Sequence, residues 1–182
     1  MGTPTIYPTG VTLYDPDKAW NGYTLMPING VGAVLIDMNG NVVKHWQDLQ
    51  GFPNKLLPGG YCMGHLGVRD TDFGYQDQTD LVQVDWDGKV VWKFDHKELI
   101  EDEGHEPQWM ARQHHDYQRE GNPVGYYVPG MDCRTDGGHT LLLCHENLYN
   151  HRISDKRLLD DCFIEVDWEG NILWEWHANE HF

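Results

Sequence analysis

One pattern occurs three times in the chain, and it constrains the fold more than any other feature. Each copy has two runs rich in β-branched residues on either side of an Asp-x-(Asn/Asp/Glu)-Gly turn, which is typical of a β-hairpin. The copies align without gaps at Ala33–Trp46, Leu81–Phe94 and Phe163–Trp176. Their turn glycines, Gly40, Gly88 and Gly170, occupy one position, where we expect a positive φ. The repeat therefore predicts an all-β chain of antiparallel hairpins.

The distance between the copies indicates the architecture. The first two turns are separated by about one blade of a β-propeller, which takes ~40–50 residues, and the last two by a blade with insertions. Further strand-like segments precede the hairpins at residues 22–28, 56–65 and 138–145. We therefore predict one partial β-propeller domain over residues 1–182, with four-stranded antiparallel blades at approximately 10–48, 52–96 and 108–178. Because open blades expose strand edges, we expect the rest of the ring on a longer chain or on a second chain.

The repeats also predict which side chains form the core and where the extra residues go. Large rings recur at alternate positions of the second strand of each hairpin, as expected for sheets that stack face to face. We expect these tryptophans to be buried: Trp46, Trp92, Trp174 and Trp176. The surplus residues lie in two polar stretches, Lys97–Gln108 and Asp116–Arg134, which we expect to be long loops.

Charge and composition exclude several classes of function. The chain has 29 acidic and 13 basic residues, a net charge of −16, and no cluster of Lys or Arg, so neither a nucleic acid nor an anionic membrane is an expected partner. No apolar run approaches the ~20 residues of a membrane span, and the N-terminus does not resemble a signal peptide. The four cysteines form no Cys-x-x-Cys motif, and we interpret them as reduced thiols of a cytoplasmic protein.

Histidines supply the candidate chemistry. His114 and His115 precede Asp116 in what we expect to be the first strand of the third blade, and first strands line the central channel of a propeller. Neighbours on a strand face opposite ways, so one of the two rings should face the channel and the other the blade packing. Asp116 would orient an imidazole, and Arg119 would supply a fixed cation. The alternative is a structural hydrogen-bond network without a catalytic role.

Two further histidines occupy equivalent places in successive blades. His65 and His145 each end a strand-like segment, where they either bind substrate or only terminate the strand. The sequence predicts no metal site, because the segment His145–His151 lacks the His-x-x-x-His spacing of zinc proteases and the Asp-x-Asn-Gly turns lack the Glu of a calcium loop. His114, His115 and Asp116 would hold an ion only with help from other blades. No phosphate-binding loop occurs, and we expect no cofactor.

Four segments together resemble the aryl-sulfate sulfotransferase family, over about residues 9–182: Gly10–Leu25, Val34–Gly40, Gln113–Asp116 and Glu165–Gly170. The resemblance implies a six-bladed propeller, of which this chain is about the N-terminal half. It also implies transfer of a sulfuryl group from an aryl sulfate ester to a phenol, without a nucleotide sulfate donor. In that family a histidine carries the sulfuryl group, while other channel histidines and an arginine hold the anion.

Applied to this sequence, the resemblance implies roles for six residues. His114, His115 and Asp116 are the candidate catalytic residues, and Arg119, His145 and His65 are the candidate substrate-binding residues. The nucleophile of the better-known members lies in a later blade, so the His-His-Asp segment matches a supporting channel histidine. The expected partners are a small aryl sulfate, a phenol and the remainder of the ring, supplied by a second chain or a further copy. The alternative function is a non-catalytic propeller scaffold or a subunit of a larger assembly.

Overall fold

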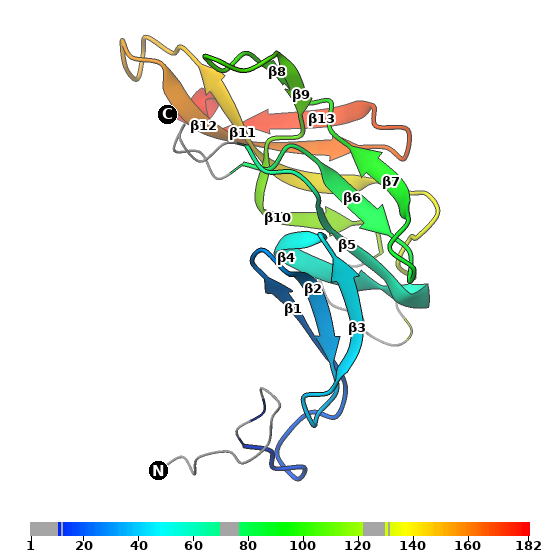
Figure 1. Cartoon of the computed structure of the whole chain (residues 1–182). Coiled ribbons are helices and arrows are strands. Elements are labelled where there is room, and N and C mark those ends of the chain that lie inside the picture. Colours follow the sequence, from blue (N-terminus) through cyan, green and yellow to red (C-terminus); the bar gives the residue numbers. More distant parts are fainter. Residues whose placement is uncertain (1–10, 12, 70–76, 122–129, 131) are drawn as a thin grey trace.

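The computed structural model describes residues 11, 13–69, 77–121, 130 and 132–182 (Figure 1). Gly10 and Thr12 of the N-terminal motif, and residues 122–129 and 131 of the second expected loop, lie outside the described residues. The described chain is all-β, as the hairpin repeats predict, and its sheets are antiparallel. None of its helices has the length and apolar character needed to cross a membrane.

Three sheets make up most of the chain, and in each of them the strands lie side by side in chain order. The first sheet contains β1 (Thr24–Ile28), β2 (Gly32–Ile36) and β3 (Val42–Gln47). The second contains β4 (Gln50–Leu57), β5 (Tyr61–His65), β6 (Leu81–Val84) and β7 (Val90–Phe94). The third contains β10 (Gln113–Arg119), β11 (Thr140–Leu148), β12 (Leu158–Val166) and β13 (Ile172–His177). The second and third sheets have the four strands expected of a blade, whereas the first has three among its described residues.

The last two strands of each sheet are the predicted hairpins. The turn glycines Gly40, Gly88 and Gly170 have φ angles of 79°, 87° and 86°, which confirms the expected left-handed conformation. In the first turn the Asp37 carboxylate accepts hydrogen bonds from the backbone N–H groups of Asn39 at 2.9 Å and Asn41 at 2.8 Å. The aspartate and the glycine of the motif therefore have separate tasks, since one closes the turn and the other permits its backbone angles.

A short hairpin replaces the first of the two expected loops. Strands β8 (Glu98–Ile100) and β9 (Gln108–Met110) pair with each other between the second and third sheets in the sequence. The prediction of a loop over Lys97–Gln108 was therefore wrong near the two ends of this range and holds for residues 101–107. Ile100 and Met110 are buried, and this apolar anchoring explains why the ends of an acidic segment form strands.

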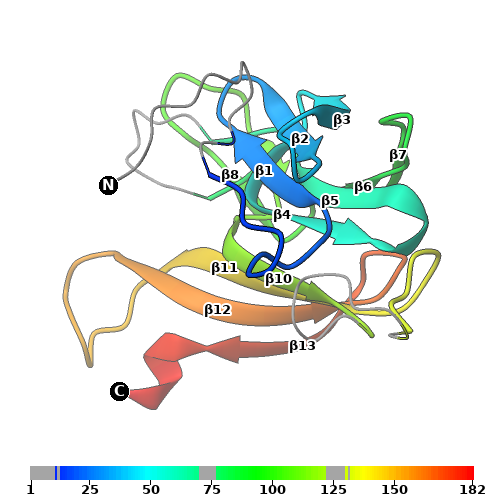
Figure 2. The ribbon, with the colours of Figure 1, turned by 90° about the horizontal axis from the view of Figure 1, so that it is seen from below.

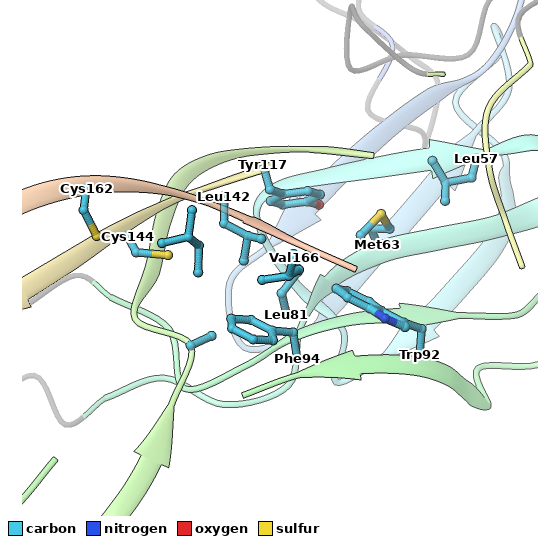
Figure 3. Packing of buried hydrophobic residues seen from close by; sticks show 12 residues of the cluster. Leu57, Met63, Leu81, Trp92, Phe94, Tyr117, Leu142, Cys144, Cys162 and Val166 are labelled. Atoms are coloured by element: carbon cyan, nitrogen blue, oxygen red, sulfur yellow. The ribbon is translucent and has the colours of Figure 1, made fainter. Parts of the chain in front are cut away.

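Of the two buried hydrophobic clusters among the described residues, one lies between the first and second sheets, and the other lies where the second and third sheets face each other. Figure 3 shows the side chains that meet there, which come from β4 to β7 on one side and from β10 to β12 on the other: Leu57, Met63, Leu81, Trp92, Phe94, Tyr117, Leu142, Cys144, Cys162 and Val166. The four cysteines of the chain are free thiols.

Indole hydrogen bonds join each sheet to the turn of the next. The Trp46 indole N–H donates to the Asp85 carbonyl at 2.9 Å, and the Trp92 indole N–H donates to the Trp168 carbonyl at 2.8 Å. The ring of Trp92 also packs on Trp168, with 6.1 Å between the centroids. Both indoles are buried, as predicted.

Trp174 and Trp176 do not follow this prediction. Trp174 is 48% exposed and Trp176 is only partly buried. Both belong to β13, the last strand of the third sheet, and in register with Glu165 and Phe163 they lie on the face turned away from the second sheet. Among the described residues no further sheet covers that face. The period-two pattern therefore predicted correctly that both rings lie on one face of the sheet, but not that this face is buried.

The first strand of the second sheet contacts the first strands of the other two sheets. β4 contacts both β1 and β10, and Figure 2 shows these strands close together while the later strands extend outwards. The Tyr117 hydroxyl on β10 donates to the Pro53 carbonyl on β4 at 2.8 Å. The candidate histidines of β10 are therefore placed next to a strand from another sheet.

The packing predicts a large difference between two tryptophans. Replacing Trp92 by Ala should lower the free energy of unfolding by ~3–5 kcal/mol, because a buried ring and its hydrogen bond are lost. Replacing Trp174 by Ala should cost only about 1–2 kcal/mol, since nearly half of that side chain already lies in water. Urea unfolding of both variants measures the difference, and equal losses would contradict the assignment of Trp92 to the core.

Candidate functional site

An irregularity in β10 determines how the two adjacent histidines lie. The register of β10 with β11 shifts between Gln113 and Tyr117, and His115 has a φ of 57°, which is unusual for a residue with a side chain. The expectation that His114 and His115 face opposite ways was therefore wrong. Their rings are perpendicular, and the two Nδ1 atoms lie 2.8 Å apart in a hydrogen bond. The bulge thus couples an exposed imidazole to a buried one.

His115 faces an open pocket at the junction of the first strands. The pocket has a volume of about 520 Å³ and is lined by Pro27 of β1, by Gly51, Phe52, Pro53, Asn54 and Lys55 of β4, and by His115 and Asp116 of β10. The Phe52 ring lies 4.7 Å from the His115 ring. The walls of the pocket are therefore an aromatic ring and two prolines, together with three ionisable side chains.

Lys55 brings a buried positive charge to this pocket. The side chain is 6% exposed, and its ammonium group donates to the Asp116 carboxylate at 2.5 Å and to the Tyr117 carbonyl. Asp116 therefore pairs with a lysine from another sheet, whereas the sequence pattern suggested that it orients a histidine. Sequence reasoning missed Lys55, which lies in a strand of the second sheet and far from His115 in the chain.

His114 lies behind His115, in contact with two residues of neighbouring strands. It is 3% exposed and stacks on the His145 ring of β11, with 3.8 Å between the centroids and 22° between the planes. Its Nε2 atom lies 3.2 Å from the Asp161 carboxylate of β12, and the His145 Nε2 atom lies 3.7 Å from the same oxygen. The structure therefore brings together two of the predicted histidines and adds Asp161, which the sequence analysis did not single out.

Burial keeps these two imidazoles neutral near pH 7. It lowers the pKa of His114 to about 4, helped by the neighbouring His145 and opposed by the Asp161 carboxylate. The pKa of His145 is also below its usual value, mainly because of burial. Each ring therefore has one unprotonated nitrogen, which can accept a proton, coordinate an ion or attack an electrophile.

A charged network supports the start of β10. Arg112 is fully buried with a φ of 54°, and its guanidinium donates to Asp77 at 2.6 Å and to Glu98 of β8 at 2.7 Å. The Arg112 carbonyl accepts a hydrogen bond from the His145 backbone N–H at 2.9 Å. This arginine therefore fixes the backbone beside both stacked histidines. The sequence analysis did not identify Arg112 as a site residue, and its position directly before the Gln113–Asp116 segment was the one signal that could have indicated it.

Two predicted substrate-binding residues lie elsewhere. Arg119 is 1% exposed, donates to Thr140 and Gln83, and lies between the rings of Trp92 and Trp168, where burial lowers its pKa to about 10. It reinforces the packing of the second sheet on the third.

His65 is 4% exposed at the end of β5, and burial lowers its pKa against the attraction of Asp80. Within the described residues, neither it nor Arg119 contacts the histidine pair of β10.

Comparisons of the chain with protein-family models, with curated proteins and with solved structures found no match.

The low pKa of His114 predicts a pH dependence of stability. As the pH falls from about 6.5 towards 4, the unfolded chain binds a proton at this residue before the folded chain does, so the free energy of unfolding should decrease. Above pH 6.5 this contribution should be constant. Urea unfolding should show a weaker decrease over that window for His114→Gln than for the wild type. An NMR titration of His114 with a midpoint near 6.5 would contradict the buried, neutral imidazole.

Proposed function

We propose that the pocket between β4 and β10 binds an aryl sulfate ester and that the chain takes part in transferring its sulfuryl group to a phenol. The observation that carries the proposal is the exposed imidazole of His115, held at Nδ1 by His114 and placed beside an aromatic ring and a buried lysine. The resemblance of the sequence to the aryl-sulfate sulfotransferases supports the same reaction class.

The proposal includes the architecture in which the pocket would function. We infer that the three sheets are consecutive blades of a six-bladed propeller, with β1, β4 and β10 beside the central channel. The contacts of β4 with β1 and β10 and the repeated indole-to-turn hydrogen bonds support this arrangement. Further blades, from the same polypeptide or from a second chain, would then complete the channel opposite the pocket.

The lining of the pocket suits an aryl sulfate in two respects. Phe52, Pro27 and Pro53 offer apolar surface for an aromatic ring. Lys55 and His115 offer N–H groups to the sulfate oxygens, and the lysine is held in place by Asp116 and the Tyr117 carbonyl. The Lys55–Asp116 pair is neutral as a whole, so the positive charge of Lys55 offsets the repulsion between the Asp116 carboxylate and a bound anion.

The reaction requires a nucleophilic nitrogen and a group that exchanges protons. A histidine nitrogen attacks sulfur, the bond between sulfur and the aryl oxygen breaks, and its electron pair leaves on the phenolate. In the second step the acceptor oxygen attacks sulfur, the sulfur–nitrogen bond breaks, and the phenolic proton passes to a neutral base. Because Nδ1 of His115 is held by His114, Nε2 is the nitrogen that meets the substrate. We assign His115 to proton exchange and anion binding, with the sulfuryl-carrying histidine in a later blade.

A specific observation favours a second candidate, a non-catalytic scaffold. The outward face of the third sheet carries the exposed ring of Trp174 and the partly buried ring of Trp176, which suits contact with another sheet or protein. This role requires no substrate in the histidine pocket. In either case we propose a cytoplasmic compartment, in which the four thiols stay reduced.

The proposed reaction predicts the effect of one substitution. Replacing His115 by Gln should reduce the turnover of phenyl sulfate, with a second phenol as acceptor, by ~10²–10⁴-fold, the usual contribution of a positioned acid–base group. The assay uses the protein with its complete ring and follows the release of phenol.

His139→Gln is the matched control, because His139 is an exposed histidine that pairs with Glu165 outside the pocket. Activity of folded His115→Gln equal to that of the control would remove the catalytic role and leave the scaffold.

A further inference from the structure

We propose that His114, His145 and Asp161 form a binding site for a divalent transition-metal ion such as Zn²⁺. The three side chains come from three adjacent strands, β10, β11 and β12, and their ligand atoms all lie within 4.8 Å of one another. Two imidazole nitrogens and one carboxylate oxygen are a ligand set of catalytic zinc and related ions, whereas Ca²⁺ and Mg²⁺ favour oxygen ligands alone.

The fold places these ligands together without a sequence motif. His145 and Asp161 are directly opposite each other in the register of β11 and β12, so both side chains lie on the same face of the third sheet. The bulge in β10 brings the His114 ring onto the same group by stacking it on His145. The nearest two ligands in the chain, His145 and Asp161, are still much further apart than the ligands on a zinc-binding helix, so a search for sequence motifs does not find the site.

The charges of the cluster leave a place for a cation. Among the described residues the Asp161 carboxylate has two basic neighbours, His114 and His145, at 3.2 and 3.7 Å. Both neighbours are imidazoles, and neither carries the fixed positive charge of a lysine or an arginine. A divalent ion would supply the missing positive charge and would bind the imidazoles in their neutral form.

The geometry also shows what must move. The Nε2 atom of His114 is buried and makes no hydrogen bond within the described part of the chain, although the Asp161 carboxylate lies 3.2 Å from it. The two rings are nearly parallel, so their Nε2 lone pairs must turn towards a common point when an ion binds. The Asp161 side chain is 57% exposed, which gives the ion access and leaves room for water ligands.

A bound ion would control the pocket histidine. When Nε2 of His114 coordinates the metal, its proton must be on Nδ1, which then donates to Nδ1 of His115. The proton of a neutral His115 is then on Nε2. With the ion bound, this side chain therefore donates an N–H group to an anion, and it can accept the phenolic proton only in the form without the ion. This consequence rests on the proposed function, but the metal site itself does not.

Titration of the metal-free chain with Co²⁺, followed by the visible absorption of the bound ion, tests the site directly, and competition with Zn²⁺ gives the affinity for zinc. We expect one ion per chain. The variants Asp161→Asn and His145→Gln should bind at least ~100-fold more weakly, since even residues that only orient a ligand contribute ~10–100-fold. The control is His139→Gln, which removes an exposed histidine paired with Glu165 at 2.8 Å, and it should bind like the wild type.

The outcomes separate the metal site from the proposed reaction. No binding by the folded wild type, or equal binding by folded Asp161→Asn and His139→Gln, would overturn the metal site, with folding checked by circular dichroism. The titration requires no aryl sulfate and no turnover. A chain that binds Co²⁺ as expected but never transfers a sulfuryl group would therefore contradict only the proposed function.

Discussion

The packing of each antiparallel sheet on the next is the interaction on which the rest of the structure depends. At two places an indole N–H group of one sheet donates a hydrogen bond to a backbone carbonyl in the turn of the following sheet. The two indoles are those of Trp46 and Trp92. At the second of these interfaces the buried guanidinium of Arg119 lies between Trp92 and Trp168 and adds cation–π contacts to the apolar core. Because the sheets are held in this way, their first strands meet, and the pocket forms where they meet.

The candidate site is therefore a property of the junction between sheets. Phe52 and Lys55 come from the second sheet and His115 from the third, while the buried His114 links the pocket to His145 and to the exposed Asp161. The bulge in β10 joins the two halves, since it turns both histidines towards each other. A regular strand would have separated them on opposite faces and left the pocket without its link to His145 and Asp161.

The sequence predicted the local features of the fold and part of the site. The Asp-x-x-Gly turns determine the hairpins through short-range hydrogen bonds and the freedom of glycine, so those elements could be located from residue order alone. Trp174 could not be distinguished from Trp92 in this way, because burial depends on whether another sheet covers the face. His114 could be found from its local motif of two histidines and an aspartate. Lys55 and Asp161 could not, because they reach the site only through contacts between strands that are far apart in the sequence.

The most direct test of whether an aryl sulfate binds at the junction of β4 and β10 is to map the binding of phenyl sulfate to the protein by NMR. The largest changes in chemical shift should occur at the His115 ring and at Phe52 and Lys55, with smaller ones at His114 through the Nδ1 contact. Shift changes confined to the outward face of β13, around Trp174, or spread over the surface without saturation would contradict binding at this junction.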